Sequence, residues 1–192
     1  MGILGIYASQ ISGHLSNPQF ESIATVSVGS GGSSSISFSS IPSTFKHLQI
    51  RAILATTQGT DRGNSALYAR FNSDTGNNYS WHQLKGSGTA ASATGYFSEN
   101  TIYGSDTLYS GGASGVFGAM VMDILDYSST NKYKTVRILN GFDSNSASNG
   151  NTSVGLNSGL WMSTSAINAI TIPNNGFNFK QYSHFALYGI KG

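Results

Sequence analysis

Cysteine is absent from this 192-residue chain, and charged residues are scarce. Without cysteine, the chain forms no disulfide, thiolate metal site or thiol nucleophile, so the fold depends on packing and hydrogen bonds alone. Asp, Glu, Lys and Arg make up 9% of the residues, where soluble domains usually have about 25%. Ser, Thr, Asn and Gly supply the polarity instead. A neutral polar surface responds little to pH or salt, which favours an extracellular scaffold or a particle surface over a cytosolic enzyme.

The sequence also lacks the features of membrane and nucleic-acid partners. No apolar run approaches the ~18 residues of a membrane span. The opening MGILGIYASQISGHL has neither the basic nor the apolar region of a signal peptide. The densest basic stretch, Lys132, Lys134 and Arg137, is too sparse to follow a phosphate backbone. We therefore expect no membrane and no nucleic-acid partner.

The sequence contains few patterns that are typical of enzymes. The four histidines are scattered, and none forms an H-x-H or H-E-x-x-H pair. The chain has no G-x-S-x-G motif. A hydrolase with paired carboxylates is the weakest hypothesis, since there are eight Asp and Glu in all. Asp123 and Asp126 both follow a predicted central strand, and Asp123 is the best candidate for a catalytic carboxylate. We predict no enzymatic activity, no metal and no cofactor.

Alternating apolar residues begin at Phe20 and continue to the end of the chain. Residues 24–28 and 36–38 alternate on either side of GSGGSSS, which predicts a hairpin. The run 116–125, VFGAMVMDIL, is apolar on both faces, which predicts a central strand with a helix as its main rival. Further strands are predicted at 48–54, 66–71, 79–84, 101–103, 134–140, 168–172 and 184–190.

Gly- and Asn-rich connectors separate these strands, among them GSGTAASATG and DSNSASNGN. Short strands between turns at this spacing are typical of an antiparallel sandwich or jelly roll. No segment has the caps and the amphipathic stripe of a three-turn helix. The sequence predicts an all-β protein, with one jelly-roll-like antiparallel β-sandwich over 21–192.

The first 20 residues differ from the rest and predict an extended N-terminal arm. Its apolar residues are interrupted by glycines, and Pro18 lies near its end. One interpretation is a frayed terminus or an edge strand on the body. The other is an attachment arm that becomes ordered on another subunit or a larger assembly, because so apolar a segment is unfavourable in water. The residues that would make this contact are Ile3, Leu4, Ile6, Tyr7 and Ile11.

Two aromatic groups suggest a binding site for a glycan or receptor. Tyr79 and Trp81 follow the polar loop 74–78, and Trp161 follows an Asn- and Gly-rich stretch. Aromatic faces beside amides and carboxylates can hold sugar rings by stacking and hydrogen bonding. The alternative is that both tryptophans are core residues or interface anchors, as large aromatics usually are. The predicted contact residues are Asp74, Asn77, Asn78, Tyr79, Trp81 and Trp161.

Parts of the chain resemble uncharacterised virion proteins of tailed bacteriophages. The resemblance rests on FESIATVSVG at 20–29, IPSTFKHLQIR at 41–51 and FNSDTGNNY at 71–79. The ending HFALYGIKG, 184–192, is similar to the final strands of phage tail and fibre proteins. These motifs mark strands and turns and contain no reaction signature.

The resemblance implies a structural protein in the virion, as a capsid decoration, a tail or fibre component, or a tail tip. The expected partners are other virion proteins, contacted through the arm. A homo-oligomer is expected, and a homotrimer by analogy with threefold appendages. The alternative is a receptor- or glycan-binding module of a tail fibre that serves host attachment. Fold does not decide between these roles.

Overall fold

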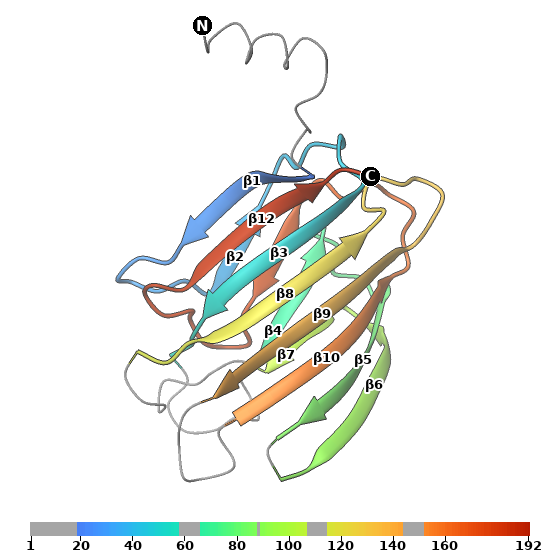
Figure 1. Ribbon diagram of the computed structural model, residues 1–192. Coiled ribbons are helices and arrows are strands. Elements are labelled where there is room, and N and C mark those ends of the chain that lie inside the picture. The colour runs from blue at the N-terminus through green and yellow to red at the C-terminus, as the bar shows by residue number, and fades with distance from the viewer. Residues whose placement is uncertain (1–18, 58–65, 88, 107–114, 144–151) are drawn as a thin grey trace, which may run out of the picture.

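The computed structural model describes residues 19–57, 66–87, 89–106, 115–143 and 152–192 (Figure 1). The arm residues Ile3, Leu4, Ile6, Tyr7 and Ile11 therefore lie outside the described residues. Within the described ranges the chain forms strands and no helix, in two antiparallel sheets. The predicted all-β class is confirmed.

The strands form one large and one small sheet. In spatial order, the large sheet consists of β1 (Phe20–Ser27), β12 (His184–Ile190), β3 (His47–Leu54), β8 (Gly118–Leu125), β9 (Lys134–Asp143), β10 (Thr152–Trp161), β5 (Tyr79–Gly86) and β6 (Ala91–Glu99). The small sheet consists of β2 (Ser35–Phe38), β11 (Ile170–Pro173), β4 (Ala66–Phe71) and β7 (Ile102–Asp106).

The strand order is that of a jelly roll. The strands β1-β12-β3-β8 lie in one layer and β2-β11-β4-β7 in the other. With β5, β6, β9 and β10 set aside, every connection along the chain crosses between the layers except the one from β4 to β7. Two Greek keys folded into two sheets give this arrangement. The predicted jelly-roll-like sandwich is confirmed.

The predicted hairpin at 24–38 is wrong. β1 pairs with β12 and β2 pairs with β11, so the two strands lie in different sheets. The GSGGSSS segment carries the chain between the sheets, where Val28 donates its N–H to the Ser183 carbonyl and Ser33 forms a bridge with Phe179. The alternation of apolar and polar residues determines which face of a strand is buried. The strand with which it pairs is determined by long-range packing.

The central strand predicted at 116–125 is confirmed as β8, which covers residues 118–125. β8 lies between β3 and β9, and its inward side chains Met120, Met122 and Ile124 are buried. Its outward side chains include Ala119 and Val121, which face solvent wholly or in part. The run is apolar on both faces because one face meets the core and the other belongs to an apolar outer surface.

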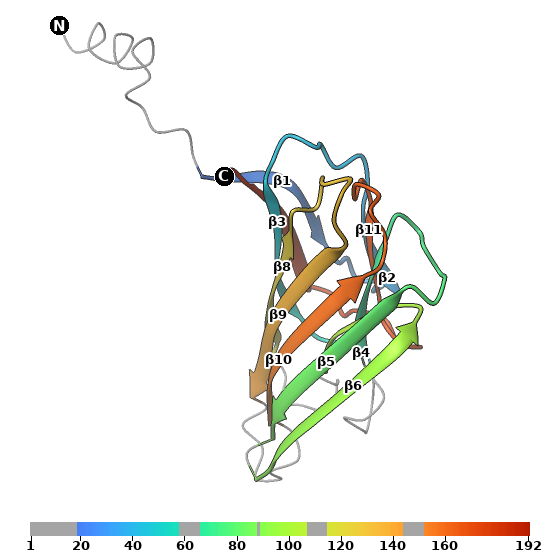
Figure 2. The same ribbon diagram turned by 90° about the vertical axis from the view of Figure 1, so that its right-hand side faces the viewer.

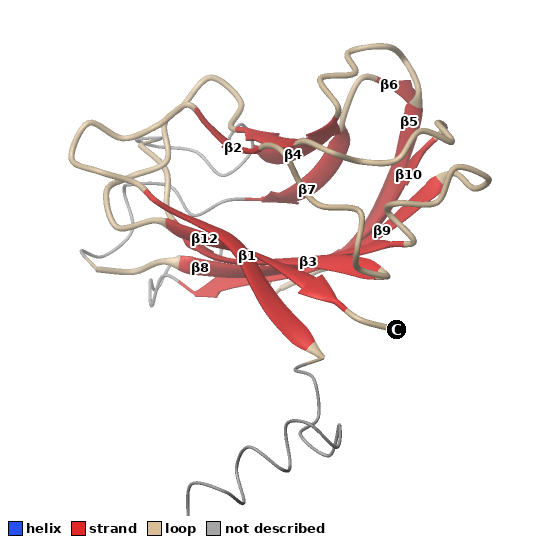
Figure 3. Cartoon of the chain, turned by 90° about the horizontal axis from the view of Figure 1, so that it is seen from above, coloured by secondary structure: helices blue, strands red, loops and turns tan. Residues whose placement is uncertain are grey.

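Two hairpins extend the jelly roll on one side. β5–β6 is inserted between β4 and β7, and β9–β10 between β8 and β11. β10 pairs with β5 from Val154 opposite Gly86 to Trp161 opposite Tyr79, which joins the hairpins. Seen from above, this side of the large sheet curls toward the small sheet (Figure 3), and Figure 2 shows it from the side. β6 and β10 were not predicted, and the second half of the predicted connector GSGTAASATG, residues 91–95, belongs to β6.

The core lies between the two sheets. Aromatic and aliphatic side chains from both layers fill it, and Phe179 meets Phe185 edge to face with their ring centroids 5.0 Å apart. Gly189 of β12 lies under the ring of Phe45, which occupies the space where a Cβ would stand. Phe45 thereby covers a glycine near the end of β12, where this strand pairs with the beginning of β3.

Gly189→Ala is predicted to destabilise the fold. The added methyl group overlaps the Phe45 ring and forces it out of its buried position, at a cost of about 1–3 kcal/mol. Gly29→Ala is the matched control, because no atom lies within 4 Å of the Cβ that it adds. Urea unfolding of both variants measures the difference. Equal stabilities for the two variants would contradict the packing described.

Candidate functional site

The aromatic residues predicted to hold a sugar are buried. Tyr79 and Trp161 stack on each other, with centroids 6.3 Å apart and planes 18° from parallel. Phe71 packs on Trp161 at 5.6 Å, and all three side chains belong to the core. The Tyr79 hydroxyl accepts the Phe71 N–H at 3.1 Å, and burial raises the pKa of Tyr79 to about 12. The phenol is therefore a neutral structural group.

Trp81 is enclosed in the same way. Its ring lies 4.8 Å from Tyr103 and 5.0 Å from Tyr96, centroid to centroid, and is itself buried. The structure therefore corrects the sugar-stacking interpretation of Tyr79, Trp81 and Trp161. These rings have no open face, and they hold β5 and β10 against β4 and β7.

Asp74 fixes the loop that precedes β5. One carboxylate oxygen accepts the Trp161 indole N–H at 2.7 Å and the Asn78 amide at 2.9 Å, and the other accepts the Gly76 N–H at 2.8 Å. The hydrogen bonds from Asn78 and Trp161 lower the pKa of Asp74. Asn77 is exposed at the tip of the loop. The structure brings all the predicted contact residues except Trp81 together, as a capped aromatic cluster.

A polar pocket of about 300 Å³ lies close to this cluster on the opposite face of β4. Arg70 donates from Nε to the Asn100 carbonyl at 3.1 Å. Burial, followed by the negative charge of Glu99, raises the pKa of Tyr68 above its ordinary value. We call this the Arg70 pocket; its walls include Tyr68, Arg70, Glu99, Asn100, Thr101 and Asn175.

The Arg70 pocket was not predicted from the sequence. Tyr68 and Arg70 alternate with the buried residues Leu67, Ala69 and Phe71 in β4, so their outward direction was readable. Their proximity to Glu99 could not be predicted, because Glu99 is the last residue of a strand that the sequence did not reveal.

The outer face of the large sheet carries a second unpredicted feature. Apolar side chains from five neighbouring strands form a continuous surface on it, through the direct pairs Val121–Leu139, Leu139–Leu156, Leu156–Leu84 and Leu84–Ala93. Val154 adjoins them on β10. We call this surface the apolar face; it consists of Leu84, Ala93, Val121, Leu139, Val154 and Leu156.

The two carboxylates considered for hydrolysis are both ion-paired. Asp123 lies within β8 rather than after it, and accepts hydrogen bonds from Gln49 at 2.7 Å and Arg137 at 2.8 Å. Asp126 forms ion pairs with Lys132 at 2.7 Å and Lys46 at 3.1 Å. Hydrogen bonds from these lysines lower the pKa of Asp126 to about 2. Asp126 is thus ionised at neutral pH and is not in the state of a general acid.

Within the ranges that the structure describes, no three His, Asp or Glu side chains gather as a metal site would require. Those same ranges contain no helix long and apolar enough to cross a membrane. The sequence matches no known protein-family model and no curated protein.

Asp74→Ala is predicted to lower the free energy of unfolding by about 1–3 kcal/mol, because it leaves the indole N–H of Trp161 without its acceptor. Asn77→Ala, on the exposed tip of the same loop, is expected to change it by less than about 0.5 kcal/mol. Thermal unfolding followed by tryptophan fluorescence compares the two. An Asp74→Ala protein as stable as the control would show that the carboxylate does not hold the cluster.

Proposed function

We propose that the chain is a non-enzymatic structural protein of a tailed-bacteriophage virion. It is displayed on the particle surface, as a capsid decoration or a tail or fibre component, and residues 1–20 attach it. The observation that carries the proposal is where the fold places the resembling segments. The segments 20–29, 41–51 and 184–192 contain β1, residues 47–51 of β3, and β12. β12 lies between the other two strands, so these segments form one continuous side of the jelly roll.

The jelly roll and its composition support this role. Double-sheet jelly rolls are an architecture of viral capsid and lectin domains. Charged residues amount to 9% of the chain, so its solubility depends little on the pH or salt outside a cell. Such a surface suits a particle that must persist in varied media.

The position of β1 supports attachment through the preceding residues. β1 is the strand at one edge of the large sheet, and it begins at Phe20. Every strand pairing of the described body therefore forms without residues 1–18. The apolar side chains Ile3, Leu4, Ile6, Tyr7 and Ile11 would fill pockets on another virion protein. Repeated copies on a symmetric particle multiply a weak contact into firm attachment.

Deleting residues 1–15 is predicted to abolish incorporation into particles and leave the body folded. Particles produced by the genome that encodes the chain are purified, and the chain is quantified in them by mass spectrometry. The isolated deletion protein should unfold at the same temperature as the full chain, because the deletion removes none of the described pairings.

The virion role and the attachment through the arm would be contradicted by different results. Absence of the full chain from purified particles would overturn the virion role. Normal incorporation of the deletion protein would overturn the arm and leave the virion role standing.

A receptor- or glycan-binding module of a tail fibre is the second candidate, and the Arg70 pocket favours it. At about 300 Å³, its volume is at the lower end of the range for ligand sites. It combines the Tyr68 ring with a guanidinium, a carboxylate and amides. These groups together suit a neutral sugar, since hydroxyl groups both donate and accept hydrogen bonds.

If the pocket holds a glycan, Arg70→Ala should reduce binding on a glycan array at least tenfold, because its guanidinium lines the pocket. Arg51→Ala removes the same charge from the other sheet and should bind as the unaltered chain does. A blank array with the unaltered chain, or equal binding by the two variants, would count against the module.

A further inference from the structure

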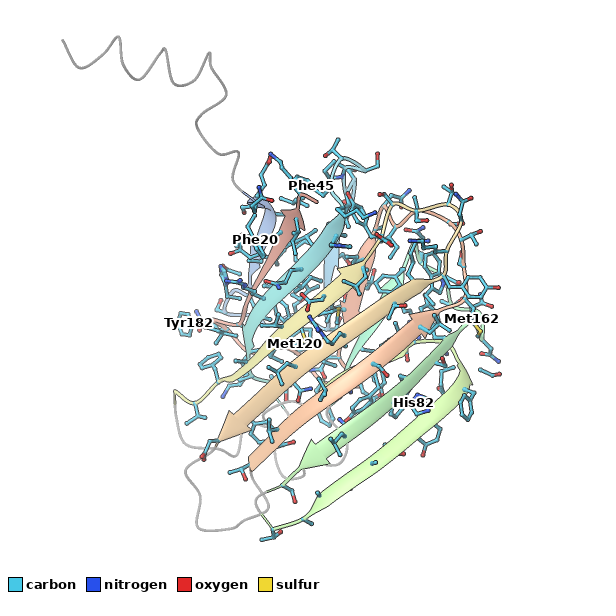
Figure 4. All side chains as sticks on the ribbon, turned by 45° about the vertical axis from the view of Figure 1, so that its right-hand side comes forward. Phe20, Phe45, His82, Met120, Met162 and Tyr182 are labelled. Carbon is cyan, nitrogen blue, oxygen red and sulfur yellow. The ribbon has the colours of Figure 1, made fainter. Side chains whose placement is uncertain are left out.

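The apolar face exposes more aliphatic surface than scattered single residues would. Leu84, Leu139, Val154 and Leu156 are 57%, 56%, 58% and 48% exposed. At about 100 Å² each, they present roughly 400 Å² of contiguous apolar surface, as much as the largest patch on a typical monomer. They come from two inserted hairpins and lie on adjacent strands (Figure 4, where the His82 label marks β5).

The apolar face has relief that suits a protein partner. Leu84 and Leu156 stand directly opposite each other on β5 and β10 and form a ridge. A hollow of about 330 Å³ lies on one side of this ridge, toward Val154 and Leu139, where Gly86 leaves room. Another of about 350 Å³ lies on the other side, toward His82 and Arg137. The ridge of one molecule can therefore enter a hollow of another.

The charges around the apolar face permit two identical surfaces to approach. The residues that define the face are all uncharged. Arg137, at one end of a hollow, is already paired with Asp123 at 2.8 Å. Lys85 borders the other hollow. The rim thus carries both signs of charge, and a surface of this kind meets its own copy with little like-charge repulsion.

We infer that the apolar face is covered by a second copy of this chain. A standard interface buries about 800 Å² on each partner, of which about 450–500 Å² is apolar. The roughly 400 Å² presented by four side chains, extended by Val121 and Ala93, matches that requirement. Area, relief and charge all fit self-association. This contact does not depend on the virion role, and it requires no residue of the arm.

The test is the mass of the full chain in solution by light scattering. The unaltered chain is expected to have a multiple of the mass of one chain. Leu156→Arg places a charge in the centre of the face, and Leu84→Arg places one on the opposing strand. Each variant is expected to reduce the mass to that of a single chain, because an unpaired charge is costly in an apolar interface.

Ser37→Arg is the control, since it adds the same charge at an exposed position of β2 in the other sheet. It should keep the oligomeric mass. Both leucines are solvent-exposed in the single chain, so each variant should melt cooperatively, and two separate variants guard against failure of one to fold. A single-chain mass for the unaltered protein, or an oligomeric mass for both folded leucine variants, would overturn the inference.

Discussion

The pairing of β10 with β5 is the constraint on which the rest of the structure depends. These strands belong to hairpins inserted at different points of the chain, and their pairing runs from Val154 opposite Gly86 to Trp161 opposite Tyr79. It brings the Tyr79 and Trp161 rings together on the inner side and Leu84 and Leu156 together on the outer side. The capped aromatic cluster and the apolar face are therefore two sides of the same pairing. A shift of one residue would exchange them.

A chain without cysteine and with little charge stabilises this arrangement through packing and local hydrogen bonds. The two-sheet core is filled by large apolar side chains, and some charged groups at the surface form ion pairs, as Asp126 does with Lys46 and Lys132. The Asp74 carboxylate is one such local hydrogen-bond acceptor, because it orders both its own loop and the Trp161 indole. Neutral polar side chains cover much of the remaining surface and leave the apolar face uncovered.

The sequence revealed the strands whose alternation was strong, and missed those without it. β3 and β12 were predicted nearly to their bounds. β6 was missed because the first half of Ala91–Glu99 has only small side chains and the strand is exposed along almost its whole length, so no alternation marks a buried face. β10 was missed because its inward positions include Ser153, Gly155, Asn157 and Gly159. The partners of β1 and β2 were unreadable, since pairing across the chain leaves no local signal. The candidate site was predictable only to the same extent. The aromatic residues were recognisable in the sequence, but only the fold shows that their side chains face inward and that Arg70 faces a pocket.

A disulfide formed across β5 and β10 would test the central pairing most directly, because the chain has no thiol of its own. His82 and Ser158 stand directly opposite each other, where Cβ atoms are about 4.5–5.5 Å apart. Asp123 and Ser158 are separated by β9, or about 10 Å. The observed pairing predicts that His82→Cys with Ser158→Cys oxidises to an intramolecular disulfide in the folded protein, and that Asp123→Cys with Ser158→Cys keeps free thiols. A bond in the second protein and none in the first would contradict it.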